Sequence, residues 1–472
     1  TTIRDVFMKA SGTKHLAVTF PASLLLGSLS IALLSPGCDS SNSHGPLPAK
    51  PDVSVTNLGQ YYSVRIDYTS ASPYAIGQEY GRLALQAFPT YERTADSYLA
   101  DTVAILKEFC EECGIDYEEL IRRAVEINKQ IKPAYQEELE GFASTLSGGR
   151  TNVMGDGKLS LDEYLVLNLT PDIATADACS AVAVYGDRAQ TGHTIVGRNM
   201  DWFPGFENQF GKMHAVVHAI TAGQEYLSIG FLGQIGSGTG INSKGLYIAN
   251  LYSDIGEEYS AVGRRSVQMD IRDVLETAST IDQAADYFGD AAKLYGYNHI
   301  MFMANKDVTK VQENYLAGDR RRELRTTESA LREGVLWEFS DAIASVNSFL
   351  LPWNPDNHFL RPDTQGLYEA GTTDFNLVNI FRWNNFREQM AQRGPVVDFA
   401  GVKTMMSYHA PQQQDLDPGT DPGDIFNTAT AQSIVYSFGD NRLEAYLIPG
   451  EPGFDDNPVY TPILMPFKPG AN

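Results

Sequence analysis

Cysteine and basic side chains are scarce in this chain of 472 residues, which contains 4 cysteines and 36 lysines and arginines. Four cysteines are too few for a scaffold of this size that is held together by disulfides. The 59 acidic residues give a formal net charge of −23, which repels phosphate backbones, so nucleic-acid binding is not expected. Internal repeats of solenoid or propeller period are also lacking, which excludes those architectures.

Apolar residues and glycines are abundant in the chain. Residues of the apolar class make up 43% of the chain, aromatic residues make up 11%, and there are 41 glycines. A chain of this length and composition buries one large core or two smaller ones. The glycine and aromatic content fits a sheet-rich globular enzyme better than a helical repeat or a low-complexity polymer.

The N-terminal segment, residues 1–38, has the pattern of an export signal. Three basic residues precede an uncharged apolar run over residues 16–34, and a polar stretch follows Cys38. The pattern resembles a bacterial lipoprotein signal with Cys38 as the lipidated residue, although Ser35 stands where a lipobox usually has Leu. We therefore expect an exported protein, either periplasmic, anchored to a membrane through Cys38, or extracellular. A cleaved signal peptide and a retained anchor are the alternatives.

Residues 39–178 have mainly helical periodicity. Residues 46–57 are polar and Pro-rich, and apolar spacing then predicts a strand over 61–67 and helices over 75–89, 95–113 and 117–141. Cys110 and Cys113 lie among glutamates, which disfavour a thiolate, so we interpret them as a structural pair and not as a redox centre.

The segment 152–163 resembles the second half of an EF-hand loop. Gly157 would be the turn glycine and Glu163 the final ligand, but Met154 occupies a position where calcium needs an oxygen ligand. The favoured interpretation is a loop that caps a helix starting near Ser160, with calcium binding as the alternative. No metal site is predicted elsewhere.

Beyond residue 178 the pattern changes to strands. The predicted strands span residues 180–185, 194–197, 214–220, 225–230, 246–250, 431–438 and 442–448, and the predicted helices span 269–289 and 381–392. The sequence thus divides into a signal segment 1–38, a helical leader 39–178 and a sheet-rich catalytic part 179–472.

Cys179 is the candidate nucleophile. It starts the predicted strand Cys179-Ser180-Ala181-Val182, and a thiol at this place needs a base close by. If the peptide bond between Ala178 and Cys179 is cut, the new α-amine has an intrinsic pKa of about 8 and can take the thiol proton near neutral pH. The alternative is an inert buried cysteine, which is the common fate of a lone cysteine in a strand.

A resemblance favours the catalytic interpretation. The Cys-Ser-Ala-Val segment and Gly197-Arg198-Asn199-Met200-Asp201-Trp202 resemble the choloylglycine hydrolase and acyl-coenzyme A:isopenicillin N acyltransferase families of N-terminal-nucleophile hydrolases. By this resemblance Arg198 binds substrate or stabilises the thiolate, and Asp201 holds the α-amine by a hydrogen bond. A cation and a carboxylate beside a thiol and an amine are what such a proton transfer requires.

Further motifs follow in the same chain order. The segment Asn242-Ser243-Lys244-Gly245-Leu246 resembles the family's Asn-x-Lys-Gly-Leu, which implies Tyr252, or else Asn250, as an oxyanion-hole residue. Ser345-Val346-Asn347-Ser348 resembles the family's Thr-Asn-His segment, so Asn347 would be the amide donor to the oxyanion. Arg382 takes the place of an arginine near the active site. Two helical motifs before residue 150 favour the acyltransferase or ceramidase-like branch, in which the leader stays bound after cleavage.

The resemblance implies an α+β fold, a four-layer αββα sandwich with a mainly helical N-terminal leader. It implies a self-processing amidohydrolase that cleaves a linear amide of a small N-acyl substrate through a thioester on Cys179, without a cofactor. Acyl transfer of the isopenicillin N acyltransferase type is the first alternative. A non-catalytic exported binding lipoprotein of the same fold is the second, and a homo-oligomer is left open. The predicted partner of the catalytic part is its own cleaved leader.

Overall fold

The computed structural model describes residues 50–109, 115–174, 178–253, 259–316, 321–352, 374–409, 424–453 and 457–470. The predicted signal segment with Cys38, and the pair Cys110 and Cys113, lie outside these ranges. Across the described part of the chain, no helix combines the length and apolar character needed to span a bilayer.

Two β-sheets form the centre of the molecule. Within the described residues the first sheet has nine strands in the order β1 (Asp52–Asn57), β2 (Tyr62–Asp67), β5 (His214–Ile220), β6 (Glu225–Phe231), β7 (Thr239–Asn242), β8 (Tyr247–Ser253), β9 (Asn298–Ala304), β10 (Thr309–Asn314) and β11 (Arg322–Arg325). The second has six, in the order β12 (Ala342–Ser345), β3 (Ala178–Val184), β4 (Ile195–Asp201), β13 (Thr430–Ser437), β14 (Arg442–Leu447) and β15 (Thr461–Ile463). All described strand pairs are antiparallel except β2 with β5.

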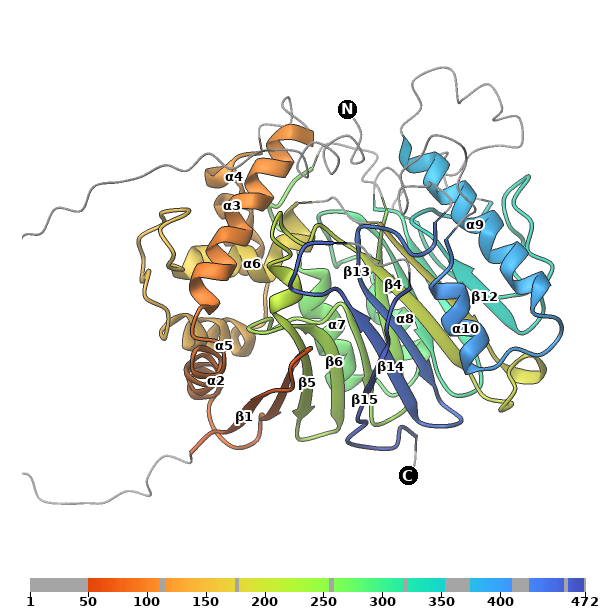
Figure 1. Cartoon of the computed structure of the whole chain (residues 1–472), viewed down its shortest axis with the longest axis horizontal. Coiled ribbons are helices and arrows are strands. Elements are labelled where there is room, and N and C mark those ends of the chain that lie inside the picture. The colour runs from red at the N-terminus through yellow and green to blue at the C-terminus, as the bar shows by residue number, and fades with distance from the viewer. Residues whose placement is uncertain are drawn as a thin grey trace, which may run out of the picture.

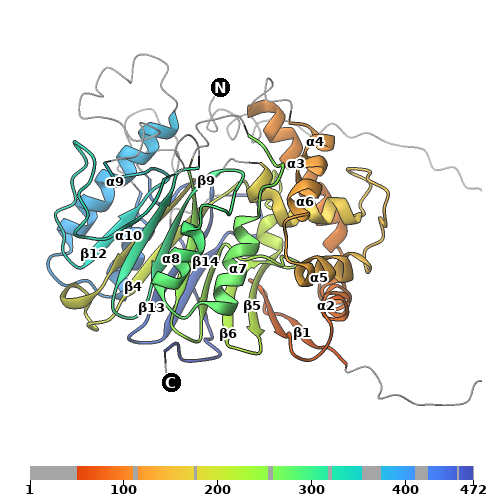
Figure 2. The same ribbon diagram turned by 180° about the vertical axis from the view of Figure 1, so that it is seen from behind.

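Helices cover the outer face of each sheet. Helices α7 (Val267–Thr277) and α8 (Ile281–Gly289) pack on the nine-stranded sheet, and α9 (Asp374–Gln392) and α10 (Phe399–Met406) pack on the six-stranded sheet. Figures 1 and 2 show these two helical layers from opposite sides.

The alternation of side chains along the strands explains this layering. In β3, Ala181 and Ala183 belong to the core between the sheets, whereas Val182 and Val184 pack against α9 and α10. Apolar residues at successive positions therefore bury both faces of the strand. The predicted four-layer αββα sandwich is confirmed.

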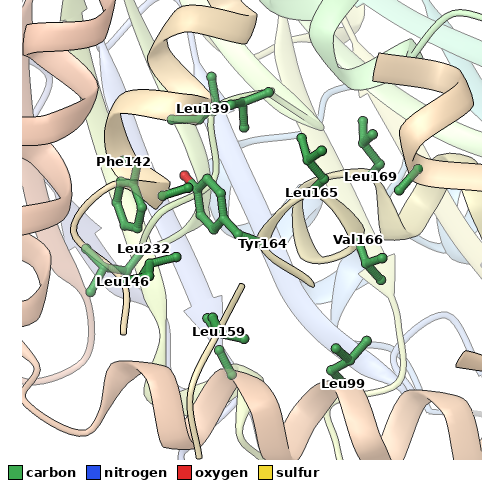
Figure 3. Packing of buried hydrophobic residues seen from close by; sticks show 14 of the residues in the cluster. Leu99, Leu139, Phe142, Leu146, Leu159, Tyr164, Leu165, Val166, Leu169 and Leu232 are labelled. Atoms are coloured by element: carbon green, nitrogen blue, oxygen red, sulfur yellow. The ribbon is translucent and has the colours of Figure 1, made fainter. Parts of the chain in front are cut away.

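The leader packs at one end of the sandwich (Figure 1). Its helices are α2 (Pro73–Ala87), α3 (Tyr91–Phe109), α4 (Tyr117–Asn128), α5 (Pro133–Ala143) and α6 (Leu161–Ile173). Figure 3 shows Phe142 of α5 and Tyr164 of α6 packed beside Leu232, which follows β6; the rings of Phe142 and Tyr164 stack with centroids 4.6 Å apart. The leader and the catalytic part thus share one apolar core.

Three parts of the structure differ from what the sequence predicts. Residues 52–57 form strand β1, which the polar composition of this stretch concealed: Val53 and Val55 alternate with polar residues and pack against the leader core, while the other positions of this edge strand are exposed. The helix expected over 117–141 is two helices, because Pro133 can start a helix but cannot continue one. The helix expected over 269–289 is interrupted at Ala278, where the backbone becomes extended and Thr280 caps α8.

The loop over residues 152–163 caps a helix, as the favoured interpretation predicted. Ser160 and Glu163 form a reciprocal capping box at the start of α6. The other carboxylate oxygen of Glu163 accepts a hydrogen bond from Tyr117. The backbone amides of Gly155 and Gly157 donate to Asp96 at 2.8 and 2.6 Å. These contacts tie the loop to α3 and to the start of α6.

Candidate active site

Strands β3 and β4 place Cys179 and Arg198 on the face between the sheets and Asp201 on the opposite, helix-facing side. In their antiparallel register Cys179 is opposite Met200, Ala178 is opposite Asp201, and Ala181 is opposite Arg198. Cys179 belongs to the core between the sheets and is 2% exposed. Arg198 shares the strand face of Val196, which lies in the same core, so its side chain extends into the space between the sheets.

The guanidinium of Arg198 contacts the thiol. Its Nη2 lies 3.5 Å from Sγ of Cys179 and donates to the backbone carbonyl of Asn250 at 3.0 Å. Arg198 is buried, and its Nε and Nη1 have no hydrogen-bond partner among the described residues. A buried cation at this distance favours the thiolate form of cysteine.

Asn347 reaches Cys179 from a distant part of the chain. It follows β12, which pairs with β3 so that Ser345 is opposite Ala181, and the loop after β12 therefore arrives beside the start of β3. The Oδ1 atom of Asn347 accepts a hydrogen bond from the Cys179 backbone nitrogen at 2.6 Å, and its Nδ2 donates to the Tyr252 carbonyl at 2.8 Å. The nitrogen that Asn347 contacts is the one that cleavage would convert to an α-amine.

Asp201 lies at the centre of a buried polar cluster. Arg382 of α9 donates to its Oδ2 at 2.6 Å, and Asn427 donates to the same oxygen at 3.2 Å. Thr430, its register partner on β13, donates to Oδ1 at 2.7 Å. The sequence predicted that Asp201 would hold the Cys179 amine; the structure instead shows this carboxylate bound to Arg382, Thr430 and Asn427, beside the Ala178–Cys179 bond.

Tyr252 and Asn250 contribute their backbone carbonyls to the site. The Tyr252 side chain packs in the cluster between β8 and the α7/α8 layer, with its ring centroid 5.4 Å from that of Tyr297. The Asn250 amide donates to the Tyr297 hydroxyl at 3.0 Å. The structure therefore does not bring these two side chains to the thiol, because successive residues of a strand face opposite sides and Ala249 and Leu251 are the ones that face the inter-sheet core.

A cleft opens from Arg198 toward the leader. Its empty volume, which includes the solvent at its mouth, is about 850 Å³. Most of the walls are apolar or aromatic: Tyr91, Ala95 and Tyr98 of α3, Leu167 and Pro171 of α6, and Met200, Trp202, Phe210, Met213, Ile229, Phe231 and Leu232 of the catalytic part. The Tyr98 hydroxyl accepts a hydrogen bond from Trp202 Nε1 at 2.5 Å and so joins the two walls.

Several residues that hold this site lie outside the sequence motifs. Thr430 and Asn427 bind Asp201, and Asn379 of α9 binds the backbone of Asn347 through its own side-chain amide, at 3.0 and 3.1 Å. Each is a single polar residue with no motif around it. Only Thr430 could have been found from the sequence, by predicting that strand β13 pairs with β4 and places Thr430 opposite Asp201.

Comparison with known proteins agrees with the motifs. Residues 188–349 match the model of the family Acyl-coenzyme A:6-aminopenicillanic acid acyl-transferase. This match includes Arg198, Asp201, Tyr252 and Asn347, and it confirms the predicted resemblance and the predicted enzyme class of acyl transfer or amide hydrolysis. No curated protein sequence matches the chain.

Solved structures with a detectable likeness share little sequence with this chain. An N-acylethanolamine-hydrolyzing acid amidase ortholog of Caenorhabditis elegans has 15% identity and a TM-score of 0.36, with 57% of this chain and 100% of that one covered. Penicillin V acylase from Agrobacterium tumefaciens has 10% identity, coverage of 57% and 83%, and a TM-score of 0.30. A conjugated bile acid hydrolase variant from Clostridium perfringens has 11% identity, coverage of 62% and 99%, and a TM-score of 0.31. The fold assignment rests on the layers described above.

Proposed function

We propose that this chain, which resembles the 6-aminopenicillanic acid acyl-transferase family over residues 188–349, is a self-processing cysteine amidohydrolase. It cleaves the linear amide bond of an N-acyl substrate through a thioester on Cys179. The observation that carries this proposal is the convergence of Arg198 and Asn347 on Cys179: one contacts the sulfur and the other contacts the nitrogen. An inert core cysteine has no need of a buried arginine and a buried asparagine on its two functional atoms.

Processing would begin with the Cys179 thiol. Its sulfur attacks the carbonyl carbon of Ala178, the bond between that carbon and the Cys179 nitrogen breaks, and the nitrogen takes up a proton to become an amine. Water then hydrolyses the resulting thioester, which leaves a carboxylate on Ala178 and a free thiol and α-amine on Cys179. Asn347 Oδ1 can accept a hydrogen bond from this nitrogen both as an amide and as an amine.

The same atoms would serve the substrate reaction. The α-amine takes the thiol proton, and the thiolate, stabilised by Arg198, attacks the substrate carbonyl. The Asn347 amide nitrogen carries two hydrogens; one is donated to the Tyr252 carbonyl, and we assign the other to the tetrahedral oxyanion. The amine product leaves with the proton, and water releases the acid from the thioester.

Arg382 and Asp201 would act on the geometry of the cleavage site. Their ion pair is buried and lies where α9 meets β4, next to Ala178. The backbone carbonyls of Asn250 and Tyr252 hold Arg198 and Asn347 in the same way from the opposite sheet. Tyr252 and Asn250 are therefore proposed to support the oxyanion donor through their main chain.

The cleft favours a hydrophobic acyl group. Its apolar walls run from α3 and α6 to Arg198, whose guanidinium contacts the Cys179 sulfur, so we propose that an acyl chain lies in the cleft with its carbonyl at the Arg198 end. Water is the proposed acceptor, because an exported enzyme would not meet coenzyme A; transfer to an amine is the second candidate, favoured by the family name. The leader forms one wall of this cleft, which supports the proposal that it stays bound after cleavage.

Intact mass and N-terminal sequencing of the purified protein test the proposal without a known substrate. Two fragments are expected, the larger starting at Cys179, and Cys179→Ala should remain one chain and be inactive on N-acyl amides of chromogenic amines. Ser180→Ala is the matched control, because Ser180 is the next residue of β3 and faces away from the inter-sheet core. Activity that survives in pure Cys179→Ala protein would refute the mechanism, and an uncut, inactive wild-type chain would favour a binding protein. Adding an amine acceptor separates acyl transfer from hydrolysis.

A further inference from the structure

A buried ion pair brackets the loop that carries Asn347. Glu313 of β10 and Arg325 of β11 are joined by a hydrogen bond of 2.8 Å between Arg325 Nε and Glu313 Oε1, and their side chains are 0% and 3% exposed. In the β10–β11 register Arg325 is opposite Val311, which belongs to the core between the sheets. The pair therefore extends from the nine-stranded sheet toward the six-stranded one.

Both members of the pair bind the backbone on either side of Asn347. On the N-terminal side, Arg325 Nη2 donates to the carbonyl of Ala344 at 2.8 Å. On the C-terminal side, the Glu313 carboxylate accepts hydrogen bonds from the amides of Leu350 at 3.0 Å and Leu351 at 3.1 Å. The two ends of the segment between Ala344 and Leu350 are thus tied to one ion pair.

This arrangement matters because Asn347 lies outside regular structure. It follows β12, which is the edge strand of the six-stranded sheet, so strand pairing alone does not hold the residues after Ser345. A buried ion pair contributes little net stability, since desolvation of two charges offsets their attraction. The Glu313–Arg325 ion pair instead fixes the positions of the two ends of the loop that carries Asn347.

We propose that Glu313 and Arg325 are positioning residues that hold Asn347 at the Cys179 nitrogen and at the oxyanion. This inference rests on the proposed function of Asn347. A displacement of a catalytic group by about 1 Å can lower the rate by about a hundredfold. Glu313→Gln keeps the size of the side chain but loses the charge and one accepting oxygen, so kcat should fall about tenfold to a hundredfold while KM changes little.

A double-variant cycle separates positioning from general destabilisation. If Glu313 acts through Asn347, then Glu313→Gln should lower kcat by less than about threefold in an Asn347→Ala background. Glu138→Gln is the matched control, because Glu138 pairs with Arg272 in a second buried ion pair, with side chains 1% and 3% exposed, between the leader and α7. It should lower thermal stability without lowering kcat of the folded enzyme.

The outcomes are distinct. A wild-type protein that is neither cut nor active would refute the proposed function, and no cycle could then be measured. With an active wild type, the positioning role is refuted if Glu313→Gln lowers kcat no more than Glu138→Gln does, or if its effect is undiminished in the Asn347→Ala background. If Glu313→Gln does not fold, Arg325→Lys takes its place in the same cycle. A lysine keeps the positive charge, but its single ammonium group cannot donate to Glu313 and to the Ala344 carbonyl in the way that two guanidinium nitrogens do.

Discussion

Asp172 should make the stability of the protein fall as pH rises. This residue lies near the end of α6, fully buried, and its carboxylate accepts hydrogen bonds from the Ser266 hydroxyl at 2.5 Å and from the Val267 amide at 2.8 Å at the start of α7. Burial raises the pKa of Asp172 from 3.8 to about 7, and the two hydrogen bonds only partly oppose this. The carboxyl therefore remains protonated in the folded chain at pH values where it is ionised in the unfolded chain.

The difference in the Asp172 pKa between the folded and unfolded chains sets both the direction and the size of the change in unfolding free energy with pH. Between pH 4 and pH 7 the folded state binds the extra proton, so the free energy of unfolding decreases as pH rises. Each unit of pKa corresponds to about 1.4 kcal/mol, and the rise to about 7 therefore corresponds to at most about 4 kcal/mol. The contribution is complete below pH 4 and is lost above pH 7.

Comparison with Asp172→Asn isolates this contribution from other titrating groups. An asparagine has the shape of the protonated acid and does not ionise, so wild type should lose about 4 kcal/mol relative to the variant between about pH 4 and about pH 8. Urea-induced unfolding of both proteins across this range measures the difference. Asp286→Asn, at an exposed position of α8, should show no such trend. A difference between wild type and Asp172→Asn that does not vary with pH would refute the reasoning.

Three further predictions concern the site and the leader. Tyr98→Ala should lower KM for longer acyl chains relative to shorter ones in a chain-length series, because it removes a ring that lines the cleft and binds Trp202. Asn347→Ala should leave a Cys179 thiol that iodoacetamide still alkylates, while turnover falls about a hundredfold or more. Arg272→Met should release the cleaved leader on size-exclusion chromatography in mild urea, since it leaves Glu138 buried without its ion-pair partner, at a cost of about 3–5 kcal/mol; co-elution as in wild type would contradict this.

The leader contact that this last prediction perturbs combines charge and aromatic packing. The guanidinium of Arg272 on α7 lies 4.5 Å from the ring centroid of Tyr68 and 4.1 Å from that of Tyr135, both from the leader. It also donates to Glu138 of α5 at 2.7 Å. A cation enclosed in this way by leader side chains would hold the two proposed fragments together after cleavage.

The motif residues of the site were predictable because each lies within a short segment of fixed spacing. Arg198 and Asp201 are three residues apart on one strand, and the β3–β4 pairing places Arg198 at the Cys179 sulfur and Asp201 opposite Ala178. The buried supports were not predictable in this way. Glu313 and Arg325 lie in segments whose periodicity gives no sign that their side chains meet, and their shared target, the backbone around Asn347, exists only once β10 and β12 face each other.

The amino-acid sequence alone predicted Cys179 as the candidate nucleophile, the order of the motifs, strands β13 and β14 and the change from helical to sheet periodicity near residue 178, because each depends on neighbours along the chain. Tertiary structure decided which atoms meet at the candidate site. It turned the side chains of Tyr252 and Asn250 to the helix-facing side of β8 and presented their carbonyls to Asn347 and Arg198 instead. It also made β1 and β2 of the leader part of the nine-stranded sheet. Both are consequences of strand pairing, which joins residues that are far apart in sequence and therefore leaves no local pattern to read.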